Sequence, residues 1–81
     1  MSTSVDHFPL VLRQLREQNG WSQEQLAERA DLNRSYVGEL ERGRAMPSLA
    51  TVGKLADALA LTPSRLLAYC EQAPRPLLNP L

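Results

Sequence analysis

The sequence predicts a small all-α protein built from five short helices. Apolar residues make up 43% of the chain but aromatic residues only 5%. A core of this composition is filled by Leu, Val and Ala, which recur here at helical intervals of three and four residues. With 81 residues, the chain can bury one core but not two. We therefore expect one domain, and the scarcity of aromatic residues disfavours a β-sandwich or barrel.

The first helix is expected over residues 8–19, after an N-terminal tail at residues 1–7. Its apolar positions follow helical spacing and are Phe8, Val11, Leu12 and Leu15. Pro9 would lie in the first turn, where a missing N–H costs nothing. Gly20 can adopt the left-handed conformation that ends a helix.

Two short helices are expected next, at residues 23–30 and 34–42. Ser22 and Gln25 match a capping box, in which each side chain accepts from the backbone N–H of the other residue. Asn33 is a strong N-cap for the next helix, which Gly43 ends. The expected inward-facing side chains are Leu26, Ala27, Ala30, Leu32, Val37 and Leu40. The connector between the two helices is only a few residues long.

The last two helices are also opened by capping residues. Ser48 caps a fourth helix whose apolar face consists of Val52, Leu55, Ala56 and Leu59. Thr62 and Pro63 open a fifth helix that runs to about Cys70, with Leu66 and Leu67 on its apolar side. We expect the domain to span residues 8–71. The proline-rich tail at residues 72–81 is expected either to fray or to pack as an arm on its own domain or a partner.

Composition excludes several classes of function. Cys70 is the only cysteine and His7 the only histidine, so we expect no intrachain disulfide, no metal site and no cofactor. Without a glycine-rich phosphate loop or a nucleophile–base set, we expect neither an enzyme nor a small-molecule site. No apolar stretch is long enough to cross a bilayer, so a cytoplasmic protein is expected. Nine Lys and Arg balance nine Asp and Glu, which is an objection to nucleic-acid binding that only charge distribution can answer.

Residues 21–43 carry the most specific pattern in the chain. Two short helices joined by a tight connector can project the second helix into the major groove of DNA. The motif comprises Ser22-Gln23 with Leu26-Ala27, an apolar residue before Asn33, then Val37-x-x-Leu40-Glu41-x-Gly43 and Pro47-Ser48-Leu49. It resembles the Cro and phage-repressor (XRE-like) family of helix-turn-helix domains, from about residue 12 to residue 67.

The resemblance implies a compact five-helix, lambda-repressor-like domain in which residues 23–30 and 34–42 are the DNA-binding pair. It also implies an internal ion pair between Arg16 and Glu41. The chain departs from the family pattern at Asp31, where many relatives carry glycine. Because Asp tolerates left-handed geometry, we expect no change of fold.

The outer face of the third helix contains the candidate base contacts Arg34, Ser35 and Glu39. Arg34 can donate a bidentate pair to guanine, Ser35 can bond several base edges, and Glu39 can accept from cytosine. Gly38 in mid-helix lowers helix propensity by about 1 kcal/mol. That cost indicates a close approach either of DNA or of a packed helix.

Contacts with the DNA backbone are expected from helix N-termini and flexible cations. The candidates are Ser22, Gln23, Asn33, Tyr36, Arg42 and Arg44. Arg34, Arg42 and Arg44 would together form a locally basic edge on a neutral molecule. Trp21, before the cap at Ser22, suits a hydrophobic staple rather than base stacking.

The sequence therefore predicts a bacterial or phage transcriptional repressor or controller that binds a palindromic operator in double-stranded DNA as a homodimer. The candidate dimer surface consists of Leu66, Leu67, Tyr69, Leu77 and Leu78. A prophage-type repressor, a restriction-modification controller and an antitoxin remain equally open. The alternative is a protein-interaction module, or an antitoxin-like partner-binding protein, that keeps the fold without binding DNA.

Overall fold

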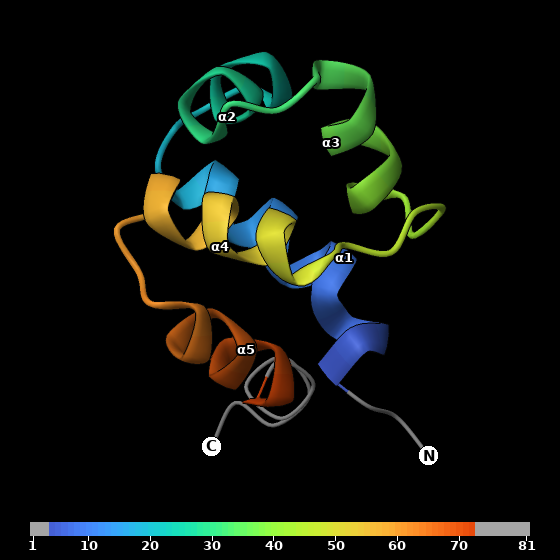
Figure 1. Ribbon diagram of the computed structural model, residues 1–81, viewed down its shortest axis with the longest axis vertical. Helices are drawn as coiled ribbons and strands as arrows, with labels where there is room; N and C mark the ends of the chain where they lie inside the picture. Colours follow the sequence, from blue (N-terminus) through green and yellow to red (C-terminus); the bar gives the residue numbers. More distant parts are fainter. Residues whose placement is uncertain (1–3, 73–81) are drawn as a thin grey trace.

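Five helices follow one another along residues 4–72, which are the residues that the computed structural model describes (Figure 1). The helices are α1 (Ser4–Gln18), α2 (Gln23–Ala30), α3 (Arg34–Glu41), α4 (Leu49–Ala58) and α5 (Pro63–Gln72). No strand occurs in this part of the chain, so the predicted all-α, five-helix architecture is confirmed. None of these helices is long and apolar enough to cross a membrane.

The start of α1 differs from the prediction. The helix begins at Ser4 rather than Phe8, so residues 4–7 of the expected tail are helical and Pro9 lies inside the helix. The first part of α1 packs against α5, where His7 Nδ1 lies 3.2 Å from the carbonyl oxygen of Cys70 and Phe8 is buried. These tertiary contacts help to offset the free-energy cost of the backbone hydrogen bond that Pro9 cannot make.

The ends of α2 and α3 follow the local capping signals. Ser22 Oγ accepts from the N–H of Gln25 at 3.1 Å, and Gln25 Oε1 accepts from the N–H of Ser22 at 2.8 Å. Asn33 Oδ1 accepts from the N–H of Ser35 at 2.7 Å. Asp31 adopts the expected left-handed conformation, with φ 57° and ψ 48°. The predicted bounds of α2 are confirmed, whereas α3 ends one residue early because Arg42 is its C-cap.

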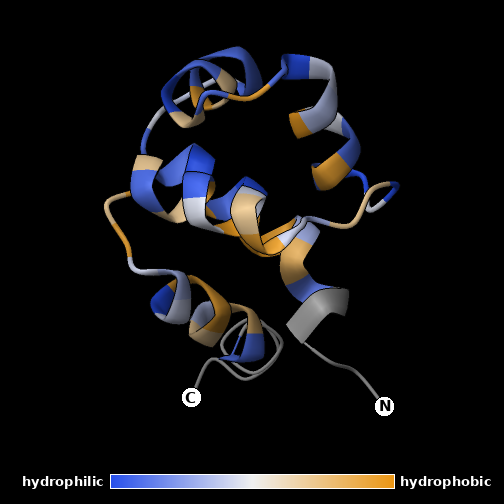
Figure 2. Ribbon diagram, viewed as in Figure 1, coloured by the Kyte–Doolittle hydropathy of each residue, from blue (hydrophilic) through white to orange (hydrophobic). Residues whose placement is uncertain are grey.

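All five helices contribute to a single core. Its largest fully buried side chains are Leu12, Leu26, Val37, Leu40, Leu55, Leu66 and Cys70. Apolar and hydrophilic residues alternate along the helices, and hydrophilic residues make up much of α2 and the start of α3 (Figure 2). In Figure 1, α2 and α3 lie together at one end of the molecule and α5 at the other, with α4 and much of α1 between them.

Two residues of α5, Leu66 and Cys70, are buried in this core. Leu66 was predicted at a dimer surface, and that prediction is wrong because its side chain is fully buried within its own domain. Cys70 is also fully buried, and desolvation raises the pKa of its thiol to about 11. The thiol therefore stays protonated at neutral pH, as expected of a small hydrophobic residue.

The C-terminal end of α4 contains a strained residue. Leu59 is the C-cap, and Ala60 follows it with a φ of 60°. The N–H of Ala60 donates to the carbonyl of Asp57 at 3.0 Å, and that of Leu61 to the carbonyl of Ala56 at 2.8 Å. This left-handed end favours glycine, because a Cβ there costs about 1 kcal/mol.

We predict that Ala60→Gly raises the free energy of unfolding by about 1 kcal/mol, as measured by urea denaturation. Ala50→Gly is the matched control, since Ala50 is equally exposed but helical within α4. It should lower the free energy of unfolding by about 0.5 kcal/mol. A loss of stability in both variants would contradict the assignment of strain to Ala60.

Candidate nucleic-acid interface

The N-terminal end of α3 is exposed and its orientation is fixed. Arg34 and Ser35 are solvent-exposed, whereas Val37 and Leu40 on the opposite side are fully buried. Asn33 caps the helix through the N–H of Ser35. Arg34 makes no ion pair with any other residue that the structure describes. Two polar side chains suited to base edges are thus presented on a rigid helix end.

A buried ion pair joins α1 to α3. Arg16 Nε donates to Glu41 Oε2 at 2.7 Å, and Arg16 Nη2 donates to Glu41 Oε1 at 3.0 Å. The two side chains are only 12% and 3% exposed. Arg16 Nη1 also donates to the carbonyl of Trp21 at 2.7 Å, next to the cap of α2. The hydrogen bond to Glu41 raises the pKa of Arg16, and the pair that the family resemblance implied is present.

The same carboxylate positions Gln23. Gln23 Nε2 donates to Glu41 Oε1 at 3.0 Å, which holds the first residue of α2 against α3. Gln23 is half-buried as a result. Sequence analysis missed this contact, because nothing in the local pattern relates two residues so far apart in the chain. Arg16, Glu41 and Gln23 together set the position of α2 relative to α3.

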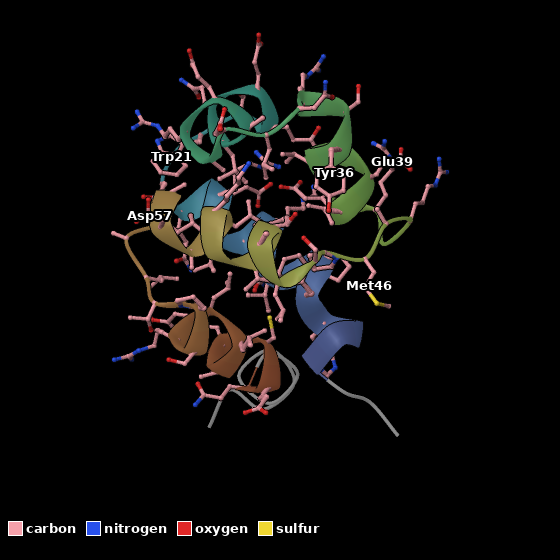
Figure 3. All side chains as sticks on the ribbon, viewed as in Figure 1. Trp21, Tyr36, Glu39, Met46 and Asp57 are labelled. Carbon is pink, nitrogen blue, oxygen red and sulfur yellow. The ribbon has the colours of Figure 1, made fainter. Side chains whose placement is uncertain are left out.

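Helix α4 makes hydrogen bonds to α3 and to the turn between α2 and α3. Tyr36 lies on the side of α3 that faces α4 (Figure 3), and its hydroxyl is 3.3 Å from Oγ1 of the buried Thr51. Lys54 Nζ donates to the carbonyl of Asp31 at 3.3 Å, in the turn between α2 and α3. A phosphate contact by Tyr36 remains a prediction, and in this structure its hydroxyl is bonded within the protein.

A second ion pair, which is exposed, lies at the C-terminal end of α3. Arg42 Nη2 lies 2.7 Å from Glu39 Oε2, and the two side chains are 50% and 40% exposed. The hydrogen bond from Arg42 lowers the pKa of Glu39, with a smaller contribution from the charge of Arg44. Glu39 points away from the core (Figure 3), and its bond to cytosine remains a prediction.

Gly38 provides the space for this arrangement. A Cβ at Gly38 would lie 3.2 Å from Arg42 Nη2, 3.3 Å from Arg42 Nη1 and 3.5 Å from Gln23 Oε1. The sequence left open whether DNA or a packed helix approaches this glycine. In the structure its nearest neighbours are side chains of the protein itself, chiefly the guanidinium of Arg42.

Of the other predicted site residues, Ser22 and Asn33 are helix caps and Arg44 lies in a loop. The side-chain oxygens of Ser22 and Asn33 accept hydrogen bonds within their caps. Arg44 is exposed in the loop after α3. Trp21 packs against the core, and the Arg29 guanidinium lies 4.5 Å from the centroid of its ring, which agrees with a packing role.

The candidate dimer surface is only partly described. Leu67 and Tyr69 of α5 are each 38% exposed. Leu77 and Leu78 lie outside the described residues. Two of the five predicted residues therefore present apolar surface to solvent.

A short helix followed across a tight, left-handed turn by a second, N-capped helix defines a helix-turn-helix domain. The helix-turn-helix family model (HTH_3) matches residues 12–66. The chain belongs to this family.

Several relatives are similar to this chain over most of its length. It is 39% identical over 71 residues to the control protein C.BamHI of Bacillus amyloliquefaciens, covering 80% of this chain and 88% of that protein. The solved structure of the restriction-modification controller protein C.AhdI from Aeromonas hydrophila superposes with a TM-score of 0.72 and 48% identity. That match covers 78% of this chain and 94% of the controller.

Other relatives are longer than this chain. It is 41% identical over 49 residues to the transcriptional regulator SutR of Escherichia coli and 39% identical over 56 residues to the immunity repressor of Bacillus phage phi105. These matches cover 60% and 69% of this chain but only 28% and 39% of those proteins. The similarity to them is therefore confined to the helix-turn-helix domain.

We predict that Glu41→Ala lowers the free energy of unfolding by about 3 kcal/mol, because it leaves the guanidinium of Arg16 buried without its partner. Thermal or urea unfolding would measure the loss. Glu17→Ala is the matched control: Glu17 pairs with Arg13 at 3.2 Å, but both side chains are more than half exposed. Its cost should be below about 0.5 kcal/mol. Equal costs for the two variants would show that the buried pair has no special structural role.

Proposed function

We propose that this protein is a sequence-specific transcriptional regulator that acts by occupying double-stranded DNA in the bacterial cytoplasm. The observation that carries the proposal is the exposed, capped start of α3, where Arg34 and Ser35 stand on a helix held by the buried Arg16–Glu41 pair. Membership of the helix-turn-helix family supports it. The mode of action is occupancy of DNA rather than catalysis.

We assign contacts with bases and contacts with the DNA backbone to different parts of α2 and α3. Arg34 would donate to guanine O6 and N7, and Ser35 would bond a neighbouring base edge. The N-termini of α2 and α3 would face phosphates, as helix N-termini favour anions. The proposed backbone contacts are Ser22, Gln23, Asn33, Tyr36, Arg42 and Arg44. Such contacts fix the register of the protein on the duplex.

We further propose that the protein binds a palindromic operator as a homodimer. One such domain makes few base contacts, and two copies on half-sites about 10 bp apart, or a multiple of this, give useful specificity. Leu67 and Tyr69 of α5 supply exposed apolar surface for the interface.

Among regulators, we favour a restriction-modification controller. The support is similarity: this chain is 48% identical to the controller protein C.AhdI and 39% identical to the control protein C.BamHI. The competing hypothesis is a protein-interaction module that keeps the fold. The observation in its favour is the net charge of zero.

We predict that selection from a random duplex library yields a palindromic consensus. Arg34→Ala should weaken binding to the selected duplex by about 1–3 kcal/mol and relax preference at one base pair of each half-site. Fluorescence anisotropy at several salt concentrations would measure both effects. Arg13→Ala, which removes an exposed arginine of α1, should retain the base preference. If no sequence is enriched and binding is weak, the protein-interaction hypothesis is favoured instead.

We predict that Leu67→Asp shifts the dimer towards monomer while leaving helicity unchanged, because a carboxylate would be buried at the interface. Sedimentation equilibrium and circular dichroism would measure the two properties. Leu49→Asp is the control, since Leu49 is 88% exposed but lies on α4. A dimer that tolerates Leu67→Asp would place the interface elsewhere.

A further inference from the structure

Arg42 is folded back over α3 instead of extending into solvent. Arg42 is the C-cap of α3, and its backbone N–H donates to the carbonyl of Gly38. Its guanidinium returns along the helix to Glu39, at 2.7 Å. Both terminal nitrogens lie within 3.3 Å of the point where a Cβ of Gly38 would be. A Cβ at this position would require the guanidinium of Arg42 to shift by a few tenths of an ångström.

The Arg42–Glu39 ion pair lies close to the proposed DNA contacts. Glu39 lies on the same helix as Arg34, and Arg42 caps the C-terminal end of that helix. The pair is also beside Gln23, whose Oε1 is 3.5 Å from the same point at Gly38. Arg42 is one of the cations proposed to contact phosphate, and in the free protein a carboxylate already holds it. Glu39 accepts from Nη2 of Arg42, and phosphate oxygens accept from the same kind of donor, so the two anions compete for that nitrogen.

We propose that Glu39 is a positioning residue that holds Arg42 in the free protein and competes with DNA phosphate for its guanidinium. The proposal rests on the proposed function, since it requires DNA binding. The competition lowers affinity for every duplex alike, because a phosphate contact carries no sequence information. Base contacts by Arg34 and Ser35 then account for a larger share of the total binding free energy, while the ratio of operator affinity to random-duplex affinity stays the same.

A negative charge near DNA would also weaken binding without any involvement of Arg42. The two explanations differ in their dependence on Arg42. Repulsion by Glu39 alone acts whether or not Arg42 is present, whereas competition disappears when the guanidinium is removed. A double-mutant cycle separates them.

The experiment measures binding of the full chain to a random-sequence duplex and to the selected duplex, by anisotropy over a series of salt concentrations. The variants are Glu39→Gln, Arg42→Gln and the double variant, each checked by circular dichroism. Glu17→Gln is the matched control, because it removes the same charge from another exposed ion pair, on α1.

We expect Glu39→Gln to tighten binding to the random duplex by about two- to fivefold, the range typical of an exposed ion pair. The slope of log affinity against log salt should become steeper by about one, which corresponds to one additional phosphate contact. The preference for the selected duplex should not increase. In the Arg42→Gln background the gain should disappear, and Glu17→Gln should have little effect.

Three outcomes would overturn the proposal. An equal gain with and without Arg42 would mean that Glu39 acts by general repulsion. A loss of affinity confined to the selected duplex, with an altered base preference, would mean that Glu39 contacts a base. Failure of the wild-type chain to bind any duplex would overturn the proposed function as well, which distinguishes that failure from the first two.

Discussion

The buried ion pair between Arg16 and Glu41 is the interaction on which the geometry of the helix-turn-helix depends. Burying two charges is costly, and a buried pair is tolerated only when its remaining hydrogen-bonding capacity is satisfied. Here the guanidinium also donates to the carbonyl of Trp21, and the carboxylate also accepts from Gln23. Within the described residues, no buried side-chain nitrogen or oxygen lacks a partner. One satisfied pair therefore fixes α1, α3 and the start of α2 together.

The outer face of α3 combines a rigid part and an adjustable part. Arg34 and Ser35 follow a capped helix start, so their backbone positions are set by Asn33. Arg42 and Glu39 are about half exposed and joined only to each other, so their pair can exchange for other partners at little cost. In this chain of zero net charge, two opposite charges thus lie side by side at the C-terminal end of α3.

Much of the fold could be predicted because its signals are local. The capping box at Ser22, the cap at Asn33 and the left-handed turn at Asp31 each involve only a few consecutive residues, and each has the predicted geometry. The start of α1 could not be predicted in this way. It depends on contacts with α5, from the far end of the described chain. Leu66 was misassigned for a similar reason, because apolar spacing does not reveal whether an apolar side chain is covered by its own core or by a second copy of the chain.

The sequence by itself determined the five helices, the exposed start of α3 and the family, because caps, glycines and apolar spacing act over a few residues at a time. Only the tertiary structure decided the state of the site's side chains. It turned the hydroxyl of Tyr36 towards Thr51, tied Gln23 to Glu41, and filled the space at Gly38 with Arg42. The physical reason is that a hydrogen bond or ion pair depends on distances in space, and only packing of the core brings these side chains within reach of one another.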